Sequence, residues 1–139
     1  MGTMTNRPDC YNASVVLDNN LAEGRGGKVA THIGNQTYTY QQLSELANRT
    51  GNALKELGVE QEQRVLMLLL DTPQFPATFF GAIKIGAVPI PTNTVMQPAD
   101  YEYFLNDSRA IVAVVSGECD SPRPSQPRRN DHVQERRKP

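Results

Sequence analysis

The chain has 139 residues, which fits one ordinary domain, and its formal net charge of −1 excludes a polyanion binder that works through bulk charge. The longest apolar run, VLMLLL, is too short to span a bilayer, and no apolar signal segment is readable at the N-terminus. Cys10 and Cys119 form neither a CxxC pair nor a metal-binding spacing, so the sequence predicts a reduced, cytoplasmic chain with no metal site.

Residues 1–27 are polar and rich in Asn and Gly, which predicts an irregular N-terminal segment. The stretch EGRGGKVA at its end could suggest a phosphate-binding loop. However, Ala22 and Val29 stand where such a loop requires Gly and Ser or Thr, and the stretch precedes a strand instead of linking a strand to a helix. It is therefore interpreted as a surface loop.

A hairpin and a long helix are expected next. KVATHI and QTYTY flank the turn residues Gly34 and Asn35, a pattern typical of a β-hairpin. Thr39 and Gln42 have the spacing of a capping box, and Gly58 stands where a helix C-terminal cap belongs. Between them one helix face carries the core candidates Leu43, Leu46, Ala47, Thr50, Leu54 and Leu57.

From Arg64 onward, strands and helices alternate. RVLMLLL, AVPIP and AIVAVV are typical of buried strands, and PQFPATFFGAIKIG and QPADYEYFLNDS are typical of helices. The residues expected to face inward are Phe75, Phe79, Ala82 and Ile83 in the first helix and Tyr101, Phe104 and Leu105 in the second. This order predicts a parallel sheet with helical crossovers. Ligands of such sheets bind beyond the strand ends, here Asp71-Thr72, Pro91 to Gln97, and Ser116 onward.

No catalytic set can be assembled from the residues. His32 lies in an expected strand and His132 near the C-terminus, and neither has an acidic or hydroxyl partner at a telling spacing. Asp71 could be a catalytic carboxylate at a strand end, but the following Pro73 favours a helix N-cap for it. No residue is predicted to be catalytic.

Residues 117–139 differ in character from the rest. They carry 6 basic and 4 acidic residues, whereas residues 1–116 carry 8 and 11, and they contain only two apolar residues and four prolines. This composition cannot form a core, so the sequence predicts a disordered basic tail. Its arginines could contact nucleic-acid phosphates, but no aromatic residues are interleaved for base stacking, which favours a solvated end.

A large part of the sequence resembles a known family. TYTYQQL, RVLMLLLDTPQFPATFFGAIKIGAVPIPTNT and PADYEYFLNDSRA are similar, in this order, to the N-terminal part of adenylate-forming (AMP-binding) acid–CoA ligases, most of all the benzoate–CoA ligase group. The resemblance runs from about Tyr11 to Ser116. It implies an α/β fold, with an incomplete doubly wound parallel sheet over 28–116 that is the first subdomain of a larger enzyme.

The resemblance also implies a reaction for complete members of the family. An aromatic carboxylate attacks the α-phosphorus of ATP to give an acyl-adenylate and pyrophosphate, and the CoA thiol then displaces AMP; ATP, Mg and CoA are required. The family's Ser/Thr/Gly-rich phosphate loop, its aromatic-Gly-x-Thr-Glu segment, its ribose-binding Asp and its C-terminal Lys have no counterpart here. In the loop TNTVMQP, where some relatives place an Arg for CoA phosphate, Asn93 and Thr94 are the CoA-side candidates.

Two hypotheses follow. In the first, the chain is a truncated or frame-shifted part of a ligase, inactive alone and needing no cofactor itself, whose partner is the missing remainder of the fold and which self-associates through exposed apolar surface. The alternative is a small free-standing α/β binding domain whose basic tail recruits an acidic partner or nucleic acid.

Overall fold

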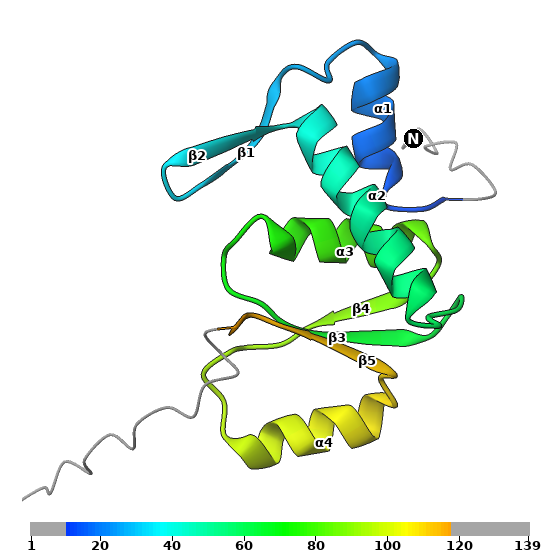
Figure 1. Cartoon of the computed structure of the whole chain (residues 1–139), viewed down its shortest axis with the longest axis vertical. Coiled ribbons are helices and arrows are strands. Elements are labelled where there is room, and N and C mark those ends of the chain that lie inside the picture. The colour runs from blue at the N-terminus through cyan, green and yellow to red at the C-terminus, as the bar shows by residue number, and fades with distance from the viewer. Residues whose placement is uncertain (1–10, 118–139) are drawn as a thin grey trace, which may run out of the picture.

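The computed structural model describes residues 11–117 as a succession of four helices and five strands (Figure 1). In chain order they are α1 (Val15–Ala22), β1 (Val29–Ile33), β2 (Gln36–Thr39), α2 (Tyr40–Glu56), β3 (Arg64–Leu68), α3 (Gln74–Lys84), β4 (Val88–Pro91), α4 (Pro98–Ser108) and β5 (Val112–Val115). The expectations for Cys10, Cys119, His132 and the tail after Gly117 fall outside the described residues.

The segment 1–27 is not irregular throughout, because it contains helix α1. Its cap residue Ser14 makes no side-chain capping bond, and the helix has only a faint amphipathic pattern. Tertiary contacts hold it instead: Leu17 is buried in a cluster with Leu43 and Ala47 of α2. Such long-range packing overrides weak local propensity, which explains why the helix was not expected from the sequence.

The expected hairpin and long helix are confirmed. β1 and β2 pair antiparallel, with Ile33 opposite Gln36 across the turn. At the start of α2, the Thr39 hydroxyl accepts from the Gln42 amide (3.2 Å) and the Gln42 side chain accepts from the Thr39 amide (3.0 Å), so the capping box is complete. Gly58 has a φ of 85°, as expected after a helix end. Leu57 was wrongly assigned to the core: it is 66% exposed.

The second half forms a three-stranded parallel sheet of order β4-β3-β5. Leu66 of β3 lies beside Ile90 of β4 and Ala113 of β5, and both pairings are parallel without interruption. The crossover helices α3 and α4 lie on opposite faces of the sheet (Figure 1). The fold is therefore α/β with an incomplete doubly wound parallel sheet, as expected.

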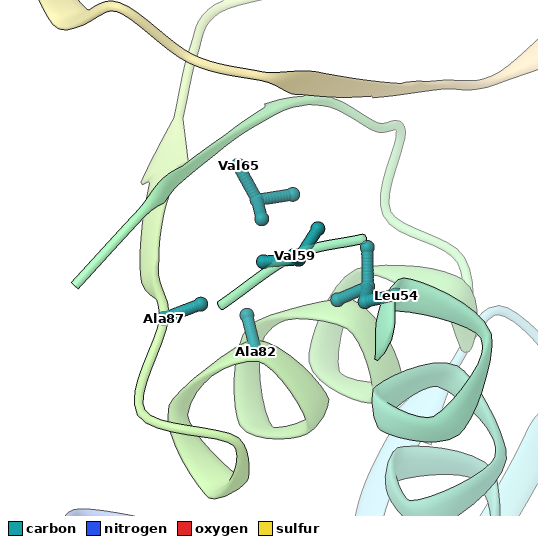
Figure 2. Packing of buried hydrophobic residues seen from close by; sticks show 5 residues of the cluster. All are labelled: Leu54, Val59, Val65, Ala82 and Ala87. Atoms are coloured by element: carbon teal, nitrogen blue, oxygen red, sulfur yellow. The ribbon is translucent and has the colours of Figure 1, made fainter. Parts of the chain in front are cut away.

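The best-formed core lies between the sheet and the two helices α2 and α3. Figure 2 shows that Leu54 of α2, Val65 of β3 and Ala82 of α3 converge with Val59 and Ala87, which lie just before β3 and β4. Burial on α3 differs from the expected stripe, because the buried residues are Ala77, Thr78, Gly81 and Ala82, whereas Phe75, Phe79 and Ile83 are only half-buried. Small residues are needed there because α2 crosses α3 closely.

Two further contacts fix α3 against its neighbours. A Cβ atom added to Gly81 would lie 2.7 Å from the Ala47 carbonyl oxygen and 3.0 Å from the Gly51 nitrogen, so the two backbones touch without side chains between them. Lys84 Nζ, at the end of α3, donates to Asp18 Oδ1 of α1 (2.8 Å) and Asn48 Oδ1 of α2 (2.9 Å). One side chain thus ties three helices together.

Helix α4 covers its face of the sheet less completely. None of its residues is buried. The expected inward residues Tyr101 and Phe104 are half-buried, and Leu105 is 40% exposed, so its assignment to the core was wrong. A single helix is narrower than a three-stranded sheet, which leaves apolar residues at the strand edges in contact with solvent.

Candidate carboxyl-edge site

The carboxyl ends of the three parallel strands share one edge of the sheet. β3 lies in the middle, and the chain leaves it for α3 on one face, while α4 on the other face leads back to β5. Ligands of open α/β sheets bind where the strand order reverses in this way. The candidate site is therefore the ends of β3 and β5 and the loop after β4, and a ligand site at these positions stays a prediction.

A hollow of about 340 Å³ lies between the ends of β3 and β5. It is lined by Leu69, Leu70, Thr72, Gln74, Val114, Val115, Ser116 and Gly117. The Leu70 amide donates to Ser116 Oγ (3.0 Å), and the Ser116 amide donates to the Leu68 carbonyl (2.9 Å), so Ser116 fastens the two strand ends together. The lining includes no charged side chain, which suits an apolar group better than a phosphate.

The loop after β4 contains Asn93 and Thr94. Asn93 is exposed and Thr94 is half-buried. Asn93 Oδ1 accepts from the Val95 amide (3.1 Å), while the Tyr101 hydroxyl donates to the Asn93 carbonyl (2.9 Å) and accepts from the Met96 amide (3.1 Å). Tyr101 of α4 thus fixes the loop. A CoA contact by Asn93 or Thr94 stays a prediction.

Asp71 is not a helix N-cap. α3 begins at Gln74 with Pro73 in the cap position, and no side chain caps it. Asp71 is exposed and lines a hollow of about 370 Å³ that also includes His32 and Thr31 of the hairpin. The sequence could not show that His32 and Asp71 line one hollow, because they are far apart in the chain and depend on where the hairpin lies relative to the end of β3.

The glycine-rich loop between α1 and β1 does not form a phosphate cradle. The amides of Gly24, Arg25 and Lys28 donate to carbonyl oxygens of the chain itself, at 3.0, 2.8 and 2.9 Å. The Arg25 side chain bonds Asn20 Oδ1 (2.7 Å) and pairs with Glu23. Since these donors are already engaged, the interpretation as a surface loop holds for this segment.

A metal cluster and a membrane-spanning helix are both absent from the described residues. Within residues 11–117 no group of three or more His, Cys, Asp and Glu side chains could hold a metal ion. No helix in that part of the chain is long and apolar enough to cross a membrane.

The described residues form a partial doubly wound α/β unit with a candidate site at the carboxyl ends of its parallel strands. The family model described as AMP-binding enzyme matches residues 19–138. The chain therefore belongs to the AMP-binding enzyme family.

Two of the curated relatives that match the chain are benzoate ligases. The chain is 49% identical over 113 residues to a benzoate–CoA ligase of Thauera aromatica, which covers 80% of this chain and 21% of the relative. It is 45% identical over 109 residues to a 4-hydroxybenzoate–CoA/benzoate–CoA ligase of Rhodopseudomonas palustris, covering 78% and 20%. The chain thus spans about a fifth of the length of the curated relatives that it matches, and the likeness is to their N-terminal region.

Solved structures agree with this result. An anthranilate CoA ligase in complex with anthranoyl-AMP matches with a TM-score of 0.78 and 39% identity, over 84% of this chain and 22% of that one. A benzoate CoA ligase from Burkholderia xenovorans LB400 matches with a TM-score of 0.73 and 40% identity, over 79% and 22%. The first subdomain expected from the resemblance is therefore confirmed.

Proposed function

We propose that residues 19–117 act as the N-terminal scaffold of an AMP-forming aromatic acid–CoA ligase. The observation that carries this proposal is the 45–49% identity to benzoate ligases over about four-fifths of the chain. The parallel sheet with helices on both faces supports it, because this is the layer on which such a site is built.

The reaction of the complete ligase joins an aromatic carboxylate to ATP, releasing pyrophosphate and forming an acyl-adenylate. The CoA thiol then attacks the acyl carbon and AMP leaves. ATP, Mg and CoA serve that complete enzyme. In this proposal the chain holds other parts of the ligase in place and supplies no catalytic side chain. The hollow between β3 and β5 fits this role, since no charged side chain lines it.

The partner that this scaffold needs is the remainder of a ligase fold. The solved ligases that it resembles extend well beyond the matched fifth of their length. We place the chain in the cytoplasm, where ATP and CoA are available. The alternative of a free-standing binding domain is not favoured, because the relatives that match most of the chain are ligases.

The chain alone is expected to form no thioester. Incubated with benzoate, ATP and CoA, it should release AMP and pyrophosphate no faster than a no-protein blank, because it lacks the family's phosphate loop and catalytic Lys. A benzoate–CoA ligase assayed in parallel shows that the assay works. Benzoate-dependent AMP release above the blank would contradict this proposal.

A further inference from the structure

The side chain of Tyr101 holds the β4–α4 loop, residues 92–97, in one shape. The Tyr101 hydroxyl donates to the Asn93 carbonyl (2.9 Å) and accepts from the Met96 amide (3.1 Å), so a single group uses its donor and its acceptor to bond the loop at two places. Inside the loop, Asn93 Oδ1 accepts from the Val95 amide (3.1 Å) and closes a turn. The backbone of the loop is therefore fixed by the first turn of α4.

Both ends of the β4–α4 loop are anchored as well. The Thr92 amide donates to the Met67 carbonyl of β3 (2.9 Å), and the Gln97 amide donates to Asp100 Oδ2 at the start of α4 (3.0 Å). The loop lies at the carboxyl edge of the sheet, where ligands of open α/β sheets bind. A loop that is ordered before a ligand arrives lowers the entropic cost of binding.

The composition of the β4–α4 loop indicates which part of a substrate it suits. Its sequence is TNTVMQ, which is mostly polar and has no charged residue. The triphosphate of ATP is typically bound by Arg, Lys or metal ions, and an aromatic ring requires a mostly apolar lining. CoA carries a long uncharged arm with amide groups between its phosphates and its thiol, and amide and hydroxyl side chains can hydrogen-bond to such an arm.

We propose that Tyr101 is a positioning residue for CoA in the complete ligase, because it holds the β4–α4 loop in the shape that receives the uncharged arm of CoA. The inference rests on the proposed function, since CoA is a substrate of the complete enzyme only. Tyr101 acts through the loop and does not touch the reacting atoms. Loss of its hydroxyl should therefore change the KM for CoA and leave kcat as it is.

A chimera tests this role. In it, residues 19–117 of this chain replace the matching segment of the Thauera aromatica benzoate–CoA ligase. Tyr101→Phe removes the hydroxyl and keeps the ring, and it should raise the KM for CoA about threefold to tenfold, as expected for the loss of one or two ordinary hydrogen bonds. The values of kcat and of the KM for ATP and for benzoate should not change. Tyr103→Phe, at a 62% exposed position of the same helix, is the matched control and should alter none of these constants.

A fragment of CoA tests the chemistry of the contact. S-methylpantetheine is the uncharged arm without the nucleotide and with its thiol blocked, so it competes with CoA and accepts no acyl group. Its inhibition constant should rise in the Tyr101→Phe chimera by the same factor as the KM for CoA. An unchanged inhibition constant, or no inhibition of the unmodified chimera, would show that the loop does not receive the arm.

The full chain provides a measurement that does not depend on activity. In hydrogen exchange followed by NMR, the Met96 amide should exchange faster in Tyr101→Phe than in the wild type or in Tyr103→Phe, because it has lost its acceptor. Equal exchange in all three would overturn the inference. An unmodified chimera without activity would contradict the proposed function and this inference with it. An active chimera in which Tyr101→Phe leaves the KM for CoA unchanged would contradict this inference alone.

Discussion

At the scale of single residues, the contact between Gly51 and Gly81 determines how closely α2 and α3 pack. The sequence could not predict this contact, because an isolated Gly in a helix indicates only a lower helix propensity. The structure explains Gly81, because Ala47 and Gly51 of α2 lie directly opposite it. The hydrogen bonds of Lys84 to Asp18 and Asn48 were hidden for the same reason, since they join residues far apart in sequence.

Gly81→Ala should therefore destabilise the chain. The new methyl group would lie 2.7 Å from the Ala47 oxygen, and that atom belongs to rigid helix backbone, so the helices must separate. Overpacking of this kind costs about 1–3 kcal/mol. Urea unfolding followed by circular dichroism measures the loss. Gly27→Ala, where an added Cβ would have no neighbour within 4 Å, is the control and should not lose stability; equal losses in the two variants would refute the account.

At the scale of elements, periodicity and caps predicted every strand and three of the four helices within residues 11–117. These elements could be predicted because buried strands appear as apolar runs and helices begin at recognisable capping residues. The errors have physical causes. α1 depends on burial of Leu17 against α2. The N-cap position of α3 is taken by Pro73 and not by Asp71. α4 presents an apolar side that nothing in the described chain fully covers.

The capping box of α2 gives a direct test at this scale. Thr39→Ala removes the acceptor of the Gln42 amide and should cost about 1 kcal/mol of unfolding free energy. Thr37→Ala, at an exposed position in the same strand, should cost less. Thermal or urea unfolding compares the two. A Thr39 variant as stable as the Thr37 variant would show that the cap does not stabilise the helix.

At the scale of the whole molecule, the sequence predicted the carboxyl edge of the sheet as the place for a site, because parallel strand ends must lie together. It could not predict the hollow between β3 and β5 or the one shared by His32 and Asp71, since both depend on how separate elements pack. The exposed apolar side chains on α4 and β5 belong to the same scale. They fit a chain that spans about a fifth of the length of the curated relatives that it matches.

The central claim is that this chain is a ligase scaffold, and a chimera tests it most directly. The matching N-terminal segment of the Thauera aromatica benzoate–CoA ligase is replaced by residues 19–117 of this chain, and benzoate-dependent AMP release is measured. The account predicts that the chimera forms the thioester, whereas the same ligase without any N-terminal segment does not. A chimera that folds cooperatively yet shows no benzoate-dependent AMP release would contradict the account.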